Sequence, residues 1–78
     1  MTTGTIATTV DATGLSCPMP IVKTAQAMRA VAPGELVELI ATDAGSLKDV
    51  VAWTRTTGNE LVEQTTDGGV YRFVIRRK

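Results

Sequence analysis

A single cysteine is the residue of this chain best suited to covalent chemistry. Cys17 lies within residues 14–20, which read Gly-Leu-Ser-Cys-Pro-Met-Pro and lead from a predicted loop into an amphipathic segment. Proline is favoured at the first position of a helix, so Pro18 predicts a helix that begins there, with Cys17 as its N-cap. The positive end of the helix dipole stabilises a thiolate and lowers the thiol pKa. The motif predicts a nucleophilic thiol; the alternative is a passive cap at a helix that the prolines begin.

The two prolines also limit the hydrogen bonds that can form around the sulfur. Neither Pro18 nor Pro20 has an N–H, and with Pro20 as the third helical residue the N–H of Met19 is the only first-turn donor predicted within reach. We therefore expect a moderate fall in the thiol pKa, which keeps the sulfur nucleophilic because nucleophilicity declines with pKa. Gly14 lets the loop turn sharply, so the thiol is expected to stand exposed at the helix tip.

The residue types that are absent narrow this chemistry. The chain has no histidine and one cysteine, which excludes Cys-His catalysis, metal sites built on imidazole, and CxxC chemistry. The carboxylates are scattered along the chain, so we expect neither a metal site nor a cofactor. Cys17 is thus predicted to act without a histidine base.

Length and composition predict one globular domain, residues 1–78. Hydrophobic residues make up 44% of the chain and charged residues 21%, as in ordinary globular proteins. One cysteine cannot form the intramolecular disulfides that small secreted domains normally need, so the cytoplasm is the expected location. The first residues do not resemble a signal peptide, and no apolar stretch approaches the length of a membrane span. We therefore expect no membrane contact.

The charges balance overall but gather at one end of the chain. Eight basic residues match eight acidic ones, and half of the basic residues lie in the last seven positions. Our first interpretation is a solvated strand end, with an acidic protein partner as the second. Direct RNA binding comes last, because the chain lacks a basic excess and aromatic platforms for base stacking. The residues of this basic run are Arg72, Arg76, Arg77 and Lys78.

The spacing of apolar residues predicts the elements that must position the cysteine. Strands are predicted over residues 6–11, 36–41, 61–66 and 70–76, and a first helix over residues 18–31. A second helix is expected between Ser46, which forms a capping box with Asp49, and Gly58 as its C′ residue. Residues 67–69 link the last two strands as a hairpin. The predicted fold is an α/β (α+β) two-layer sandwich of order β-α-β-α-β-β, with a four-stranded mixed sheet and both helices on one face.

Two elements also carry predictions about which side chains face solvent. In the first helix, Lys23, Gln26 and Arg29 are left for solvent by the apolar spacing. In the last strand, Tyr71, Phe73 and Ile75 should pack on the helices, while the alternating Arg72, Val74 and Arg76 should meet water. Trp53 in the second helix is expected to be partly buried.

Residues 11–20, which read Asp-Ala-Thr-Gly-Leu-Ser-Cys-Pro-Met-Pro, resemble the CPxP signature of the TusA/SirA-like sulfur carrier family. The resemblance runs almost from end to end and includes the break at Pro33-Gly34, the acidic turn at Asp43 and the terminal residues 67–73. It implies a small cytoplasmic sulfurtransferase in the carrier sense, which takes a sulfane sulfur onto its cysteine as a persulfide and passes it to another protein.

The resemblance also implies roles for individual residues. Cys17 matches the cysteine that carries the sulfur in the family. Pro18 and Pro20 match the two prolines of its signature, and Gly14 and Leu15 match the residues that lead into it. Cys17 is therefore the expected catalytic residue, and the other four support the motif.

Partner contacts are expected around the cysteine. Met19 is interpreted as an outward contact for partners or, equally, as a core residue. Lys23 is interpreted as a residue that favours an anionic sulfur or an acidic partner or, equally, as an ordinary solvated lysine.

The resemblance implies a cysteine desulfurase or rhodanese-like donor, a DsrE/TusD-like or other acceptor protein, and a monomer when free. The acceptor pathway stays open among tRNA thiolation, cofactor synthesis and sulfur oxidation. The alternative function is a non-catalytic interaction or regulatory module that uses the CPxP loop for docking.

Overall fold

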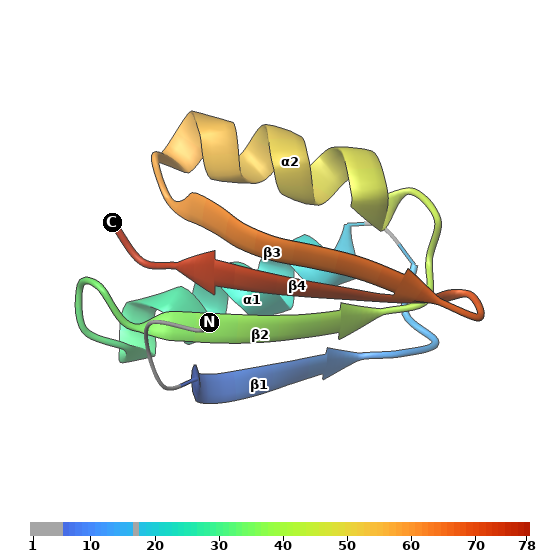
Figure 1. Cartoon of the computed structure of the whole chain (residues 1–78), viewed down its shortest axis with the longest axis horizontal. Helices are drawn as coiled ribbons and strands as arrows, with labels where there is room; N and C mark the ends of the chain where they lie inside the picture. The colour runs from blue at the N-terminus through green and yellow to red at the C-terminus, as the bar shows by residue number, and fades with distance from the viewer. Residues whose placement is uncertain (1–5, 17) are drawn as a thin grey trace.

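The computed structural model describes residues 6–16 and 18–78 and confirms the predicted order β-α-β-α-β-β (Figure 1). The second strand and the last strand occupy the predicted residues, because each is a β-branched and apolar run that lies between turn residues. The elements are β1 (Ile6–Ala12), α1 (Met19–Ala30), β2 (Leu36–Ala41), α2 (Ser46–Thr57), β3 (Glu60–Asp67) and β4 (Val70–Arg76).

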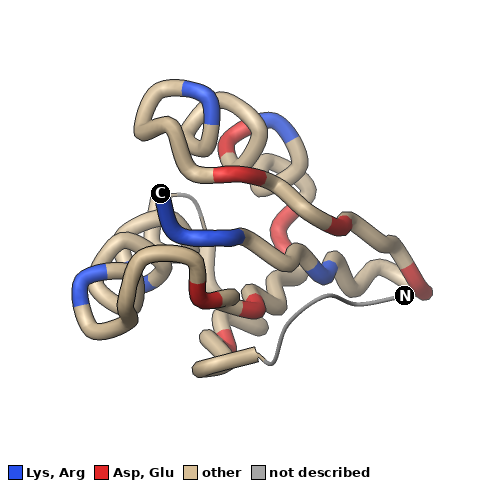
Figure 2. The backbone as a smooth tube through the Cα atoms, turned by 60° about the vertical axis from the view of Figure 1, so that its left-hand side comes forward, with Lys and Arg blue, Asp and Glu red and all other residues tan. Residues whose placement is uncertain are grey.

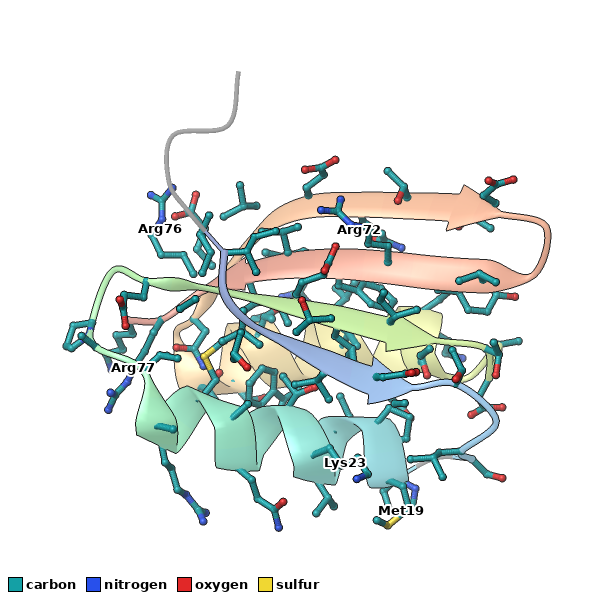
Figure 3. All side chains as sticks on the ribbon, turned by 90° about the horizontal axis from the view of Figure 1, so that it is seen from below. Met19, Lys23, Arg72, Arg76 and Arg77 are labelled. Atoms are coloured by element: carbon teal, nitrogen blue, oxygen red, sulfur yellow. The ribbon has the colours of Figure 1, made fainter. Side chains whose placement is uncertain are left out.

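The four strands form one mixed sheet in the order β1-β2-β4-β3. β1 and β2 are parallel, as the α1 crossover requires, and the other neighbouring pairs are antiparallel. Both helices lie on one face of the sheet, and no described helix or strand covers the other face (Figure 3). The predicted two-layer architecture is therefore confirmed.

The core lies between the helices and the two inner strands. Val37 and Leu39 of β2 and Phe73 and Ile75 of β4 are completely buried, and Val50 of α2 packs against them. Partly buried side chains close the margin of this core, among them Leu15, Trp53 and Tyr71. The predicted positions of Trp53 and of the inward residues of β4 are confirmed.

The other side of β4 differs from the prediction. Val74 was expected to meet water, yet it is only 2% exposed on the face that carries no helix. Leu36 shares this face, because Glu38 two positions further on points to the same side of β2, and it is 1% exposed. The helix-free face thus has buried apolar residues of its own.

The ends of α2 correct one prediction and confirm another. Gly45 is the N-cap of α2, and no side chain caps the helix, so the predicted capping box of Ser46 and Asp49 is wrong. Ser46 already lies inside the helix and is buried, with no hydrogen-bond partner for its hydroxyl among the described residues. At the other end, Gly58 has φ +80° and its N–H donates to the Thr54 carbonyl at 3.0 Å. The predicted end of the helix is confirmed.

The link between the last two strands is shorter than predicted. Asp67 still pairs with Val70, so only Gly68 and Gly69 form the turn of the hairpin. Their φ angles are +58° and +83°, and a two-residue turn with positive φ at both positions suits the right-handed twist of the flanking strands. Of the helices in the described part of the chain, none has the length and apolar character needed to cross a membrane.

Candidate functional site

The CPxP segment lies where several elements meet at one edge of the sheet. β1 and β2 are parallel, so the loops that follow them, residues 13–18 and 42–45, leave the sheet at the same edge. Both helices begin at this edge, and the turn between β3 and β4 lies there too (Figure 1). The N-terminal ends of two helix dipoles therefore lie on the side of the molecule that holds the CPxP segment.

A hydrogen-bonded turn begins the loop after β1. One carboxylate oxygen of Asp11 accepts hydrogen bonds from the backbone N–H of Thr13 at 3.0 Å and from the Thr13 hydroxyl at 2.7 Å. These bonds favour the ionised carboxylate and lower the pKa of Asp11 below its ordinary value. The side chains thus fix the direction in which the chain leaves β1.

Gly14 and Leu15 connect this turn to the rest of the fold. Gly14 has φ +78°, so the predicted sharp turn is confirmed, and its N–H donates to the Thr42 hydroxyl at 2.8 Å. The N–H of Leu15 donates to the Ala12 carbonyl at 3.1 Å, and the half-buried Leu15 side chain packs against the core. Thr42 lies in the loop after β2. Its role could not be predicted from the sequence, because its hydrogen bond to Gly14 depends on the parallel alignment of β1 and β2.

The start of α1 differs from the prediction by one residue. Met19 is the first helical residue and Pro18 is the N-cap, whose carbonyl accepts the N–H of Val22 at 3.1 Å. The predicted N-cap role of Cys17 is therefore wrong, because Cys17 precedes the N-cap. The placement of Cys17 itself lies outside the described residues.

The predicted hydrogen bond from Met19 to the Cys17 sulfur involves an atom outside the described residues. The N–H of Met19 donates to the Ser16 carbonyl at 2.9 Å, so this donor is already engaged within the described residues. Pro20 is the second helical residue rather than the third, and it has no N–H. The helical acceptor of the Ile21 N–H is the Cys17 carbonyl, which lies outside the described residues. Ile21 is thus the one first-turn residue for which no acceptor is described, so the helix start offers one backbone donor at most.

Pro20 has a packing role that the sequence reasoning missed. Its side chain is buried, and the hydroxyl of Thr24, which is 0% exposed, donates to the Pro20 carbonyl at 2.8 Å. Pro20 therefore anchors the first turn of α1 to the core, while Pro18 lies at the surface. The only sequence signal for Thr24 is its spacing of four residues from both Pro20 and Met28.

Met19, Val22 and Lys23 form an exposed surface on the first turns of α1, which we call the α1 flank. Met19 is 43% exposed and Val22 40% exposed, and Lys23 is also exposed. Met19 and Lys23 lie close to each other on the side of α1 that faces away from the sheet (Figure 3). Met19 therefore faces outward, as predicted, and the core interpretation is wrong, while its contact with partners stays a prediction.

The basic run at the end of the chain makes internal contacts, and its last residues lie away from this site. Arg72 forms an ion pair with Glu38 and another with Glu63 at 3.3 Å, and Arg76 pairs with Glu60 at 3.4 Å. Arg77 donates to the Val31 carbonyl, and the backbone N–H of Lys78 donates to the Asn59 side chain at 2.9 Å. Arg76 and Arg77 lie at the end of the sheet opposite to Met19 (Figure 3). These contacts favour a structural role over an RNA-binding surface.

Comparisons with known proteins agree with this arrangement. The family described as sulfurtransferase TusA matches residues 8–77. The putative sulfur carrier protein YrkI of Bacillus subtilis is 44% identical over 68 residues, which cover 87% of this chain and 91% of that protein. The sulfur carrier protein TusA of Allochromatium vinosum is 43% identical over 68 residues, which cover 87% of this chain and 90% of that protein.

A solved structure shares the fold. The SirA-like protein from Desulfitobacterium hafniense superposes with a TM-score of 0.78 over 88% of this chain and 95% of that chain. Its sequence is 24% identical, so the likeness concerns the fold alone.

Proposed function

Since this chain belongs to the TusA family of sulfur carrier proteins, we propose that it takes a sulfane sulfur onto Cys17 as a persulfide and passes it to the cysteine of an acceptor protein. One observation carries the proposal. Ser16, Pro18 and Met19, which flank Cys17 on either side, are all exposed at the tip of α1. Transfer between two protein thiols needs this kind of access, because the partner must bring its own cysteine to the sulfur.

The proposed reaction is a thiol exchange in two balanced steps. The Cys17 thiolate attacks the outer sulfur of a donor persulfide, so a new sulfur–sulfur bond forms on Cys17 while the donor bond breaks and the donor cysteine leaves as a thiolate. An acceptor thiolate then attacks the outer sulfur of the Cys17 persulfide and releases Cys17. No net oxidation occurs in either step. The chain thus acts as a sulfurtransferase in the carrier sense, since Cys17 is regenerated.

The surroundings of the CPxP segment suit a thiolate that remains nucleophilic. The start of α1 favours a negative charge, which lowers the pKa of a nearby thiol. At most one first-turn N–H is left to bond the sulfur, so we expect the pKa of Cys17 to fall only moderately. A strongly stabilised thiolate would be a poorer nucleophile, and a relay needs a sulfur that attacks and is attacked in turn.

The donor and the acceptor follow from this chemistry. A cysteine desulfurase and a rhodanese-like sulfurtransferase both present an outer sulfur on a cysteine, and either can load Cys17 by the step above. The acceptor is a protein with a free cysteine, such as a DsrE/TusD-like protein, in tRNA thiolation, cofactor synthesis or sulfur oxidation. We place the relay in the cytoplasm, where thiols are kept reduced.

Intact-protein mass spectrometry tests the proposal. The chain is incubated with a cysteine desulfurase and cysteine, or with a rhodanese and thiosulfate, and Cys17→Ser is compared with the wild type. The wild type is expected to gain about 32 Da, the mass of one sulfur atom, which a reductant removes as expected of a persulfide. Ser16→Ala is the matched control and should load like the wild type.

Two outcomes would contradict the assignment. Equal loading of Cys17→Ser would place the sulfur elsewhere. A wild type that binds both donors but gains no sulfur from either would favour the alternative of a non-catalytic interaction module. The donor that succeeds indicates the pathway.

A further inference from the structure

The two helices carry an uneven share of the charge. They hold four of the eight basic residues of the chain and one of its eight acidic residues, while the remaining segments hold four basic and seven acidic residues. Figure 2 shows the basic positions along both helices and most acidic positions along the strands and loops. The helical layer is therefore the basic side of a chain that has no net charge. Its cations are Lys23, Arg29, Lys48 and Arg55, and its one carboxylate is Asp49.

A shallow apolar groove lies on the exposed side of α2. It has a volume of about 460 Å³ and runs from the first turn of the helix to its last. Ala52 lies four residues after Lys48 and three before Arg55, so these three residues share one stripe of the helix in which a small side chain separates two long ones. Leu47 and Val51, which are four residues apart, form the neighbouring apolar stripe. The full lining is Leu47, Lys48, Asp49, Val51, Ala52 and Arg55.

The groove combines apolar surface with cations that the fold does not use. Lys48, Ala52 and Arg55 are exposed, and neither cation has an ion pair with any residue of the described ranges. Asp49 also lines the groove, which leaves its lining with one excess positive charge. A ligand that complements this surface offers an aliphatic side chain to Ala52 and carboxylates to Lys48 and Arg55.

The spacing of the cations limits the kind of segment that fits. Lys48 and Arg55 are seven residues apart, which corresponds to about 10 Å along a helix. Two carboxylates on one side of a helix match this separation when they lie seven residues apart. The groove begins with Leu47 in the first turn of α2, at the edge of the sheet that also holds the CPxP segment (Figure 1).

We propose that this α2 groove docks an acidic segment of the protein that donates sulfur to Cys17, with an aliphatic side chain over Ala52 and carboxylates beside Lys48 and Arg55. The proposal rests on the proposed function and adds to it a docking surface separate from the cysteine. Partner binding then survives the loss of the thiol, and it weakens as salt screens the exposed charges.

Binding to the donor tests the groove without any sulfur chemistry. The Cys17→Ser chain is titrated by isothermal titration calorimetry against the two donors of the loading experiment, the cysteine desulfurase and the rhodanese. The same titration is made with Lys48→Glu and Arg55→Glu added, and with Ala52→Trp added. We expect a Kd for the cognate donor that rises at least about tenfold in each groove variant, because two attractions become repulsions or the groove is filled. Arg29→Glu and Gln26→Trp on α1 are the matched controls and should bind like the parent.

Loading rates separate this proposal from the function on which it rests. In the wild-type background the groove variants should load slowly from the protein donor but normally from inorganic polysulfide, which needs no docking surface. Equal slowing with both donors would assign the effect to the reactivity of Cys17 and would overturn the docking proposal. Absent binding to either protein, or binding that the groove variants do not change, would overturn it as well.

A second copy of the chain is the remaining candidate occupant of the α2 groove, and a measurement of the oligomeric state detects it. Size-exclusion chromatography with light scattering would then show a wild-type dimer that the groove variants dissociate. That result would assign the groove to a second copy of the chain and would also overturn the proposal. A failure of sulfur loading with unimpaired, groove-dependent donor binding would instead count against the proposed function alone.

Discussion

The helix-free face of the sheet and the helical layer carry basic residues in two different states. On the sheet, Arg72 is paired with Glu38 and Glu63, and Arg76 is paired with Glu60. On the helices, the cations form no ion pair with the described part of the chain. Two of the four basic residues that cluster in the sequence are therefore neutralised by the fold, whereas the scattered ones keep their charge for a partner. The scattered cations are Lys23, Arg29, Lys48 and Arg55.

Strand register explains the pairing on the sheet. Glu60 lies directly opposite Arg76 across the β3–β4 pair, and Glu38 lies diagonally from Arg72 across the β2–β4 pair. Direct and diagonal neighbours on one sheet face are close enough for long side chains to meet. Thr9 of β1 completes the row, because it lies opposite Glu38 and its hydroxyl donates to the Glu38 carboxylate at 2.9 Å.

The largest expected effect concerns the helix-free face of the sheet. It tests whether the apolar residues beside its ion pairs stabilise the fold as core residues do. Leu36 is 1% exposed there although no helix covers it, whereas Val22 on α1 is 40% exposed. We expect Leu36→Ala to lower the free energy of unfolding by about 2–5 kcal/mol, as for other buried leucines, and Val22→Ala to lower it by less than about 0.5 kcal/mol. Urea unfolding followed by circular dichroism measures both. A loss below about 1 kcal/mol for Leu36→Ala would mean that the helix-free face opens readily to water.

A smaller effect is expected from the ion pairs themselves. Arg72, and then Thr9, donate hydrogen bonds to the ionised Glu38 and lower its pKa below the ordinary value of 4.5. We expect Glu38→Gln to cost about 1–2 kcal/mol of unfolding free energy at neutral pH. Glu60→Gln should cost less, because that pair is longer and more exposed.

Acid should remove the difference between the wild type and Glu38→Gln. A carboxylate whose pKa is lower in the folded state stabilises the fold above its unfolded pKa, and this contribution is lost as the pH falls through the folded pKa. The stability of the wild type should therefore fall more steeply than that of Glu38→Gln once the pH drops below about 4.5, the ordinary value for the carboxyl group. Urea unfolding over a pH series measures this, and parallel curves for the two proteins would show that the pairing contributes nothing.

Some elements of the fold could be predicted from the sequence, whereas the burial of particular residues could not. β2 could be predicted to the residue because Pro33-Gly34 precedes it and Asp43 follows it. The exposure of Val74 was predicted wrongly because the alternation of residues in one strand does not show what the neighbouring strands place beside it. Glu38 and Glu63, which pair with Arg72, lie opposite Val74 on the same face. Ser46 was misplaced because a capping residue and a buried first-turn residue differ by one position along the chain, and only packing decides between them.

At the site, the residue types could be predicted but not their contacts. The Gly14 turn and the outward Met19 follow from local chemistry. The bond from Gly14 to Thr42 depends on the parallel pairing of β1 and β2, which joins residues 28 positions apart. The start of α1 was missed by one residue because proline is accepted both at the N-cap and in the first turn, so two prolines fit either register.

The smallest expected effect concerns the unpaired cations of the helical layer. Lys48→Ala and Arg55→Ala should each change the free energy of unfolding by less than about 0.5 kcal/mol, because their side chains are exposed and form no ion pair within the described ranges. Arg72→Ala is the contrast, since it leaves the mostly buried Glu38 carboxylate without its cation. Urea unfolding of the three variants measures the difference.

The result decides what the helical cations are for. If Lys48→Ala and Arg55→Ala leave stability unchanged but weaken donor binding, the charge on α2 serves recognition and not the fold. If either variant destabilises the chain as much as Arg72→Ala does, the distinction between a neutralised sheet and a free helical layer fails. In that case a loss of donor binding in the α2 variants would have to be attributed to unfolding, and only Ala52→Trp, which keeps both cations, would still report on the groove.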